Sequence, residues 1–254
     1  MPLMYEDEAM AKGYARHRPA LHPLIIAEVR NRLRWHHPVA WALDVGCGSG
    51  LSMAPLTALA ERCIGLEPAA PMLKWARTIA PGGAFVCAKA EHLPFPERAF
   101  DLITAAGSLN YVDVACVLPE LARVMKRDGT LIVYDFTHGR SFADSDRLDA
   151  WFEAFTARYP RADDGWRPIT RESLKNDARG VRLKAFEPFT QTLTYDAASY
   201  SDYAMTESNV RQAISNGHPA FQIRNWCEQS LRQVFQGESK AVVFQGYIAY
   251  LQIR

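Results

Sequence analysis

The chain has 254 residues, enough to bury a full hydrophobic core in one domain with a modest appendage. Apolar residues make up 48% and charged residues 22%, as in soluble globular proteins, and 29 Lys+Arg balance 28 Asp+Glu. This balance points to no nucleic-acid or lipid partner, and no apolar run approaches the about 20 residues that span a bilayer. Because the start of the chain is too charged for a secretory signal, the sequence predicts a cytoplasmic protein without membrane partners.

The first half of the chain alternates apolar, β-prone runs with helical patterns. A helix is predicted over 22–34, where Pro23 precedes apolar residues spaced along one helix face. The stretch LSMAPLTALAERC (51–63) is also expected to be helical, with Pro55 in its first turn. Strands are predicted at 39–45, 62–67, 84–88, 100–106 and 130–136, the last after a turn at Asp128-Gly129. Strands that alternate with helices predict a parallel sheet with right-handed crossovers.

After residue 136 this alternation stops. Two further strands are predicted at 186–195 and 241–253, each preceded by a long insertion. The sequence contains no repeat and no Gly/Ser-rich linker. We therefore expect a single domain over 1–254, with an N-terminal arm at 1–22 and lid insertions at 137–185 and 197–240.

The stretch ALDVGCGSGLS (42–52) places three glycines at alternate positions behind an aspartate. A P-loop requires Gly-Lys-Ser/Thr at the start of the next helix, and here the chain has Gly50-Leu51-Ser52, which excludes it. A dinucleotide fingerprint requires glycine at its first, third and sixth positions, and the sixth position counted from Gly46 is Leu51. A pyrophosphate site at this turn is therefore disfavoured.

The pattern Asp44-x-Gly46-x-Gly48-x-Gly50 resembles motif I of the class I S-adenosylmethionine-dependent methyltransferases. In that family the glycines let the backbone approach an amino acid and a ribose, and the acid helps to hold the methionine moiety. One carboxylate that accepts from both ribose hydroxyls binds this diol best. An acid is therefore expected at the end of the second strand, and Glu67 stands there. The resemblance implies S-adenosylmethionine as cofactor. It also implies an α/β, Rossmann-like, doubly wound, seven-stranded sheet that is mostly parallel and whose last strand is antiparallel.

Two further stretches resemble cofactor-binding parts of the family. CAKAEHLPFPERAFD (87–101) is similar to the adenine site, so Ala90 is expected to offer its amide to the base and Glu91 to lie against it. Lys89 stands where many relatives carry Asp or Ser, so no side-chain bond to the adenine amine is expected from it. The resemblance also assigns Pro68, Met72 and Ala106 to the cofactor site.

The N-terminal stretch GYARHRPALHP (13–23) is similar to the Tyr-x-x-x-Arg-Pro segment of a subgroup that includes trans-aconitate and ubiquinone-type enzymes. The resemblance implies that Tyr14 and Arg18 fold over the cofactor and that Arg18 pairs with the methionine carboxylate. The alternative is a polar N-terminal arm without a ligand.

The loop AAGSLNYVD (105–113) matches the family segment that passes the sulfonium and opens toward the acceptor. Asn110 and Tyr111 are therefore candidates beside the reacting centre; the alternative is a helix-capping Asn and a packed Tyr. His138, two residues beyond the fifth strand, is the first candidate for a general base and Asp135 the second, unless His138 is a bystander in its loop. The other histidines lack metal-ligand spacing, so no metal is expected.

The insertions carry aromatic residues that allow two interpretations. They either form the core of the lid or line a pocket for a flat or apolar acceptor, with a cation–π contact to the sulfonium. These residues are Trp151, Phe152, Phe155, Tyr159, Tyr200 and Tyr203. Basic residues on the same insertion, Arg140, Arg147 and Arg171, also fit an acidic substrate.

The resemblance implies an enzyme that transfers a methyl group by in-line displacement to a small-molecule acceptor, at oxygen or nitrogen. The alternative is an enzyme that uses the same cofactor without intermolecular transfer, for example by cyclising its aminobutyryl arm and releasing methylthioadenosine. A nucleic-acid or protein methyltransferase, or a binder without activity, is the third possibility. SLNY follows the fourth strand in place of an Asn/Asp-Pro-Pro-aromatic stretch, which disfavours nucleic acid. The acceptor and the oligomeric state are not predicted.

Overall fold

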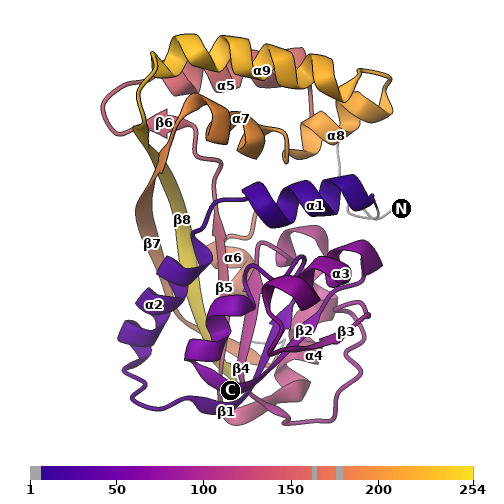
Figure 1. Ribbon diagram of the computed structural model, residues 1–254. Coiled ribbons are helices and arrows are strands. Elements are labelled where there is room, and N and C mark those ends of the chain that lie inside the picture. Colours follow the sequence, from indigo (N-terminus) through magenta and orange to yellow (C-terminus); the bar gives the residue numbers. More distant parts are fainter. Residues whose placement is uncertain (1–6, 162–164, 176–179, 254) are drawn as a thin grey trace.

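The computed structural model describes residues 7–161, 165–175 and 180–253, and its centre is an eight-stranded sheet. The strand order is β3-β2-β1-β4-β5-β8-β6, and β7 pairs with β8 (Figure 1). The parallel strands are β1 (Val39–Val45), β2 (Ala60–Leu66), β3 (Ala84–Val86), β4 (Phe100–Ala106) and β5 (Met125–Phe136). Antiparallel pairing joins β8 (Lys240–Ile253) to β5, to β7 (Val181–Tyr195) and to β6 (Ser141–Phe142). This order confirms the predicted α/β, Rossmann-like sheet with an antiparallel last strand.

The sheet has eight strands where seven were predicted, because the two-residue strand β6 was not predicted. It can pair with β8 because β8 is longer than the parallel strands. The C-terminal half of β8 pairs with β5, from Gly246 to Gln252, and its N-terminal part extends past the end of β5. There Val242 and Val243 pair with β6. The strand β7 follows β8 along its whole length, and the two strands rise together from the sheet to the upper helices (Figure 1). They connect the lower half of the molecule to the lid.

Helices cover both faces of the parallel strands. Ala42 of β1 packs on one face, with α2 (His22–Leu33) and α3 (Ala70–Ile79). Leu43 packs on the other, with α4 (Val114–Val124). Successive side chains of a strand point to opposite faces, so the apolar run of β1 is buried on both sides. The two faces thereby form two separate apolar cores.

Three predicted elements differ from the structure. The segment after the glycine turn is not an α-helix but a 3₁₀ helix, η1 (Ala54–Ala58), because β2 already begins at Ala60 and leaves room for one short turn. Asp128-Gly129 is not a turn but part of β5, where a register shift between Phe100 and Leu102 of β4 accommodates it. Predicted strand 186–195 begins earlier, at Val181, since its exposed Arg182 and intervening Lys184 obscure the apolar alternation.

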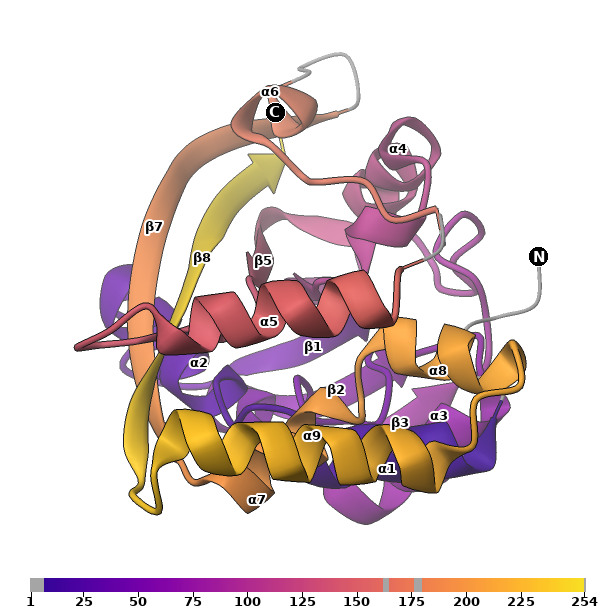
Figure 2. The same cartoon turned by 90° about the horizontal axis from the view of Figure 1, so that it is seen from above.

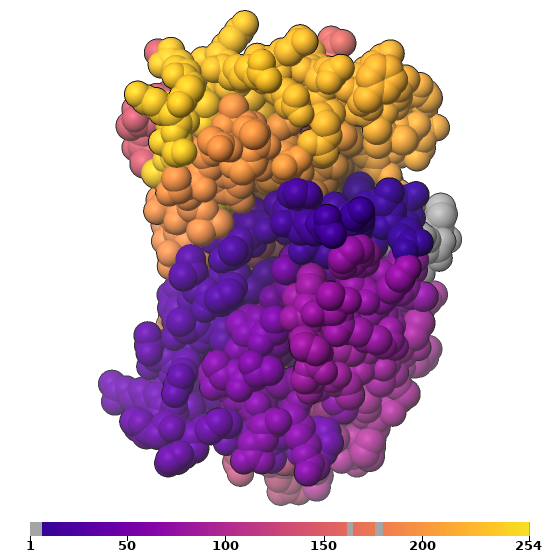
Figure 3. All heavy atoms as spheres, viewed as in Figure 1, coloured from indigo at the N-terminus to yellow at the C-terminus, as the bar shows by residue number. Residues whose placement is uncertain are grey.

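The lid lies above the carboxyl ends of the parallel strands. It contains α5 (Arg147–Arg158), α7 (Ala197–Ala204), α8 (Ser208–Ser215) and α9 (Ala220–Phe235). Figure 2 shows α5 and α9 crossing the molecule above the sheet. The helix α1 (Glu8–His17) contacts both α3 and α7, so it lies between the lid and the sheet (Figures 1 and 3). The short α6 (Arg171–Leu174) contacts β7.

The predicted arm 1–22 thus contains α1 and the start of α2. Parts of the predicted arm and of the first lid insertion lie outside the described residues, namely 1–6, 162–164 and 176–179.

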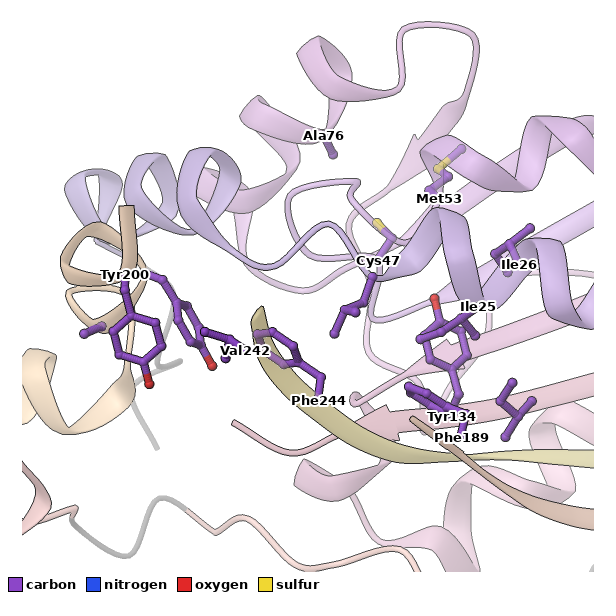
Figure 4. Close-up of a cluster of buried hydrophobic side chains, with 14 of the residues drawn as sticks. Ile25, Ile26, Cys47, Met53, Ala76, Tyr134, Phe189, Tyr200, Val242 and Phe244 are labelled. Atoms are coloured by element: carbon purple, nitrogen blue, oxygen red, sulfur yellow. The ribbon is translucent and has the colours of Figure 1, made fainter. Parts of the chain in front are cut away.

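The aromatic residues of the insertions form the core of the lid. The six residues named from the sequence are at most 8% exposed, and the rings of Trp151 and Phe155 stack with centroids 5.0 Å apart. Figure 4 shows Tyr200 beside Val242 and Phe244 of β8, in one cluster that continues to Tyr134 of β5. Burial of this cluster fixes the lid to the sheet through β8.

Candidate active site

The glycine turn leaves β1 with three residues in the left-handed backbone region. Gly46, Gly48 and Gly50 have φ of 69°, 54° and 88°. A Cβ on Gly46 would lie 2.3 Å from Cβ of Ser108, and one on Gly50 would lie 2.9 Å from Cα of Ala76. These two glycines are therefore required for close packing of the turn against the segment after β4 and against α3, as well as for its conformation.

Gly48 differs from the other two because it faces Glu67 at the end of β2. A Cβ on Gly48 would have only the methyl group of Met72 nearby, at 3.3 Å. The amide of Gly48 donates to Oε2 of Glu67 at 3.2 Å, and the amide of Ala69 donates to Oε1 at 2.8 Å. Each carboxylate oxygen can accept a second bond, so Glu67 retains acceptor capacity beside an open glycine.

Glu67 is 8% exposed and lies close to a second buried carboxyl group. Burial raises the pKa of Glu67, the two backbone amides oppose this, and the charge of Asp44 adds to the increase. A buried carboxylate of this kind is stabilised by ligand hydroxyl groups that donate to it.

Asp44 is fully buried, and both of its oxygens accept hydrogen bonds from the protein. Ser52 Oγ donates to Oδ2 at 2.6 Å and Thr104 Oγ1 donates to Oδ1 at 2.7 Å. Burial raises the pKa of Asp44 to about 6, although both hydroxyls lower it. Asp44 therefore ties β1 to β4 and to the glycine turn, and its contact with a methionine moiety stays a prediction.

The raised pKa of Asp44 predicts a pH-dependent stability. A carboxyl group whose pKa rises from 3.8 to about 6 on folding favours the folded state below its unfolded pKa, and this contribution is lost as pH rises through 6. Asp44→Asn removes the titration. We expect the free energy of unfolding of the variant, relative to the wild type, to increase with pH between about 4 and 7, by up to about 3 kcal/mol. Urea unfolding across this range measures it.

Asp128→Asn is the control, because Asp128 is exposed on β5. Its difference from the wild type should show no such increase. A pH-independent difference for Asp44→Asn would contradict the prediction.

The remaining predicted cofactor residues lie at the carboxyl ends of neighbouring strands. Pro68 follows β2, and its carbonyl accepts from Sγ of Cys87 at 3.4 Å, which ties the start of the α3 segment to the end of β3. Ala90, 9% exposed, and the half-buried Glu91 follow β3, and Ala106 ends β4. The parallel strands thus bring these residues to one edge of the sheet, as expected for this topology.

Arg18 is held between the arm and the lid. Its guanidinium carbon lies 4.9 Å from the ring centroid of Tyr14 and 5.5 Å from that of Tyr203. Nη1 of Arg18 donates to Oε1 of Glu207 at 2.9 Å. The predicted pairing of Arg18 with a methionine carboxylate stays a prediction, and in the structure its charge neutralises a lid carboxylate.

Asn110 is a buried residue within the 3₁₀ helix η2 (Leu109–Tyr111), not its cap. Its Nδ2 donates to the carbonyl of Arg167 at 3.1 Å, whereas its buried Oδ1 has no hydrogen-bond partner among the described residues. Tyr111 is 41% exposed rather than packed. The alternative of a capping Asn and a packed Tyr is therefore wrong, and an unpaired acceptor lies just beyond β4.

His138 lies beyond β5, beside two carboxyl groups. Its Nδ1 is 2.8 Å from Oε2 of Glu207, and its ring centroid is 5.3 Å from that of Phe152. Burial raises the pKa of Asp135, and the amide of Phe136 and the charges of Arg18 and His138 oppose the increase. His138 thus lies beside a buried acid, and its role as a general base stays a prediction.

Three of these polar residues were not identified from the sequence. Ser52 and Thr104 hold Asp44, and a signal existed for Thr104, since a parallel pairing of β1 with β4 places it beside Asp44. Glu207 lies in the lid far along the chain from Arg18 and His138, and no local pattern marks it. In the described ranges, no group of three or more His, Cys, Asp or Glu side chains is arranged to hold a metal ion. Nor does any described helix have the length and apolar character needed to cross a membrane.

A comparison of the sequence with known protein families agrees with the strand order, the glycine turn and the acid after β2. Residues 43–133 match the family model of the methyltransferase domain. These residues form a class I S-adenosylmethionine-dependent methyltransferase domain. The methyl donor that this family implies is S-adenosylmethionine.

Curated relatives of the methyltransferase domain include three bacterial proteins. The uncharacterized methyltransferase YcgJ of Bacillus subtilis is 32% identical over 99 residues, 37% of this chain and 39% of its own length. The ubiquinone/menaquinone biosynthesis C-methyltransferase UbiE of Campylobacter jejuni is 33% identical over 102 residues, which cover 37% of this chain and 43% of UbiE. The ubiquinone biosynthesis O-methyltransferase of Rhodopseudomonas palustris is 29% identical over 153 residues, which cover 57% of this chain and 58% of that protein. The chain thus spans between two fifths and three fifths of these relatives.

The crystal structure of YcgJ extends the likeness in fold beyond the methyltransferase domain. It superimposes with a TM-score of 0.56 over 92% of this chain and 98% of YcgJ, at 19% sequence identity. At this identity the comparison supports the fold alone.

Proposed function

We propose that the chain transfers the methyl group of S-adenosylmethionine to a small-molecule acceptor, at oxygen or nitrogen. The observation that carries this proposal is the position of Glu67, whose carboxylate lies across from Gly48 with acceptor capacity for a ribose. Two of the relatives are methyltransferases of quinone biosynthesis, which favours a small-molecule acceptor. One of them is a C-methyltransferase and the other an O-methyltransferase, so they do not decide the atom that is methylated. We also infer one domain with an N-terminal arm and two lid insertions.

The residues present fit this cofactor. When bound, S-adenosylmethionine supplies a methyl group on a positively charged sulfur that is already a good leaving group. Glu67 would hold the ribose hydroxyls beside Gly48, while Pro68 and Met72 would lie against the nucleoside. Ala90 and Glu91 would hold the adenine. Tyr14 and Arg18 would close over the methionine moiety from α1, with Asp44 and Ala106 beneath it.

The acceptor would lie beyond β4 and β5, under the lid. Asn110 offers a buried, unpaired oxygen there, and Tyr111 is exposed nearby. His138 would act as the general base for an acceptor that arrives protonated. Alignment of the acceptor with the sulfonium can contribute on the order of 7 to 11 kcal/mol to lowering the barrier, so few catalytic groups are needed.

Incubation with methyl-labelled S-adenosylmethionine tests the proposal. We expect S-adenosylhomocysteine to form only when a metabolite extract is added, and one metabolite to gain a labelled methyl group in mass spectrometry. Release of methylthioadenosine without an acceptor would instead support an intramolecular reaction. Absence of S-adenosylmethionine binding in calorimetry would contradict both functions.

A further inference from the structure

Glu207 lies where three separate parts of the chain meet. It follows α7 in the lid and is 5% exposed. Oε1 accepts from Nη1 of Arg18, at the end of α1, at 2.9 Å. Oε2 lies 2.8 Å from Nδ1 of His138, in the segment after β5. One buried carboxylate is therefore shared by a fixed cation and an imidazole.

The surroundings keep this carboxylate ionised. Burial alone would raise the pKa of Glu207, but the charge of a protonated His138, the charge of Arg18 and hydrogen bonds with His138 and Tyr203 hold it below its usual value. When His138 is neutral, Arg18 remains as the fixed cation beside the carboxylate. An ionised carboxylate only accepts hydrogen bonds. The imidazole nitrogen nearest to it, Nδ1 of His138, lies 2.8 Å from Oε2 but is not aligned as a hydrogen-bond donor in the structure. A turn of the ring that points Nδ1–H at Oε2 leaves the lone pair of a neutral imidazole on Nε2.

His138 is the accessible member of the pair. Its side chain is 35% exposed, against 6% for Glu207. The ring of Phe152 lies on one side of it, and Asp135 is a second carboxyl group on which the charge of His138 acts. The lid thus supplies the acid, and the edge of the sheet supplies the base that a ligand can reach.

We propose that Glu207 is a positioning residue that orients His138 as the general base for a hydroxyl acceptor, an inference that rests on the proposed methyl transfer. The hydroxyl proton passes to Nε2 of His138 as the oxygen–methyl bond forms and the sulfur–methyl bond breaks. Glu207 stabilises the imidazolium that results, and the neutral thioether leaves as S-adenosylhomocysteine. Arg18 keeps Glu207 ionised and so preserves its role as acceptor.

The oriented base favours a hydroxyl over an amine. A neutral amine attacks with its own lone pair and loses its proton afterwards, so it gains little from a base in the transition state. A hydroxyl oxygen becomes a strong nucleophile only as its proton leaves. Among acceptors that reach the site uncharged, the dyad therefore favours oxygen nucleophiles over amines.

Nitrogen-15 NMR of the imidazole rings tests the orientation without knowledge of the acceptor. In the wild type at about pH 9, where unperturbed imidazoles are neutral, we expect the Nδ1–H tautomer for His138, assigned by the signal lost in His138→Gln. In Glu207→Gln the single carbonyl oxygen should bind Arg18 and turn the amide NH₂ toward His138. The tautomer should then change to Nε2–H. An Nε2–H tautomer in the wild type would overturn the proposal even if the variant does not fold.

Asp202→Asn is the matched control. Asp202 is another lid carboxylate near an arginine and a histidine, with Oδ1 on Arg224 and Oδ2 3.8 Å from His17. This variant should leave the His138 tautomer unchanged. A loss of the Nδ1–H tautomer in Asp202→Asn as well would reduce Glu207 to a general structural role.

Once the metabolite screen has identified an acceptor, steady-state kinetics of its methylation completes the test. Glu207→Gln should lower kcat by on the order of 10²-fold with little change in KM, whereas a structural ion pair would alter both. Methylation of amines but not of hydroxyl compounds would overturn the inference. Calorimetry with S-adenosylhomocysteine separates the two proposals: if the wild type does not bind it, the proposed function fails, whatever the tautomer.

Discussion

Glu67→Ala is expected to weaken S-adenosylhomocysteine binding at least about tenfold, equivalent to about 1.4 kcal/mol or more. The substitution removes the acceptor for the ribose hydroxyls, and charge-assisted hydrogen bonds of this kind are the strong ones. It also leaves the amides of Gly48 and Ala69 without their present acceptor, which loosens the glycine turn. Isothermal titration calorimetry measures the affinity.

Glu61→Ala is the matched control, since Glu61 is an exposed carboxylate on the same strand, β2. It should bind the nucleoside as the wild type does. Thermal unfolding without ligand should accompany both titrations, so that a loss of affinity is not mistaken for a loss of folded protein. Unchanged affinity in a folded Glu67→Ala protein would refute the ribose assignment.

The sequence predicts the parts of this site that are local. The glycine turn follows one strand directly and Glu67 ends the next, so parallel pairing brings them together once the strand order is known. The lengths of the segments around them were less predictable. The register of β2 on β1, with Ala60 opposite Val39, determines that η1 is short, and no residue within 51–59 carries that information.

Contacts between distant segments leave no pattern in a single sequence. Arg18 and Glu207 are separated by 189 positions and meet only because β7 and β8 carry the lid above α1. Taken alone, Arg18 fits a ligand carboxylate as well as a protein one. In the folded chain Arg18 binds Glu207 of the lid. The aromatic spacing predicted only a lid core or an acceptor pocket, and it gave no sign that the lid supplies a carboxylate to the site.

The three glycines of the turn should respond differently to alanine. At Gly46 a side chain meets Ser108 at 2.3 Å in addition to the cost of a positive φ. We expect Gly46→Ala to lose about 2 to 5 kcal/mol of stability, from strain of about 1 to 2 kcal/mol and overpacking of about 1 to 3. For a domain of this size the melting temperature should fall by at least about 5 °C.

Two comparisons separate strain from overpacking. Gly217 has φ of 94° and no atom within 4 Å of an added Cβ, so Gly217→Ala should show the cost of strain alone. Ser108→Gly removes the Cβ that the new methyl group meets. The double variant with Gly46→Ala and Ser108→Gly should therefore regain part of the stability that Gly46→Ala loses. Equal melting temperatures for Gly46→Ala and Gly217→Ala would show that the backbone of the turn shifts to accommodate the methyl group and that its packing against Ser108 is not required.

Gly48→Ala should separate folding from binding. Its added Cβ meets only the flexible Met72, so its stability should lie near that of Gly217→Ala. The same methyl group would occupy the space beside Glu67 that we assign to the nucleoside, so S-adenosylhomocysteine should bind at least about tenfold more weakly, or about 1.4 kcal/mol. Wild-type affinity for S-adenosylhomocysteine in Gly48→Ala would show that the nucleoside does not occupy the space between Gly48 and Glu67.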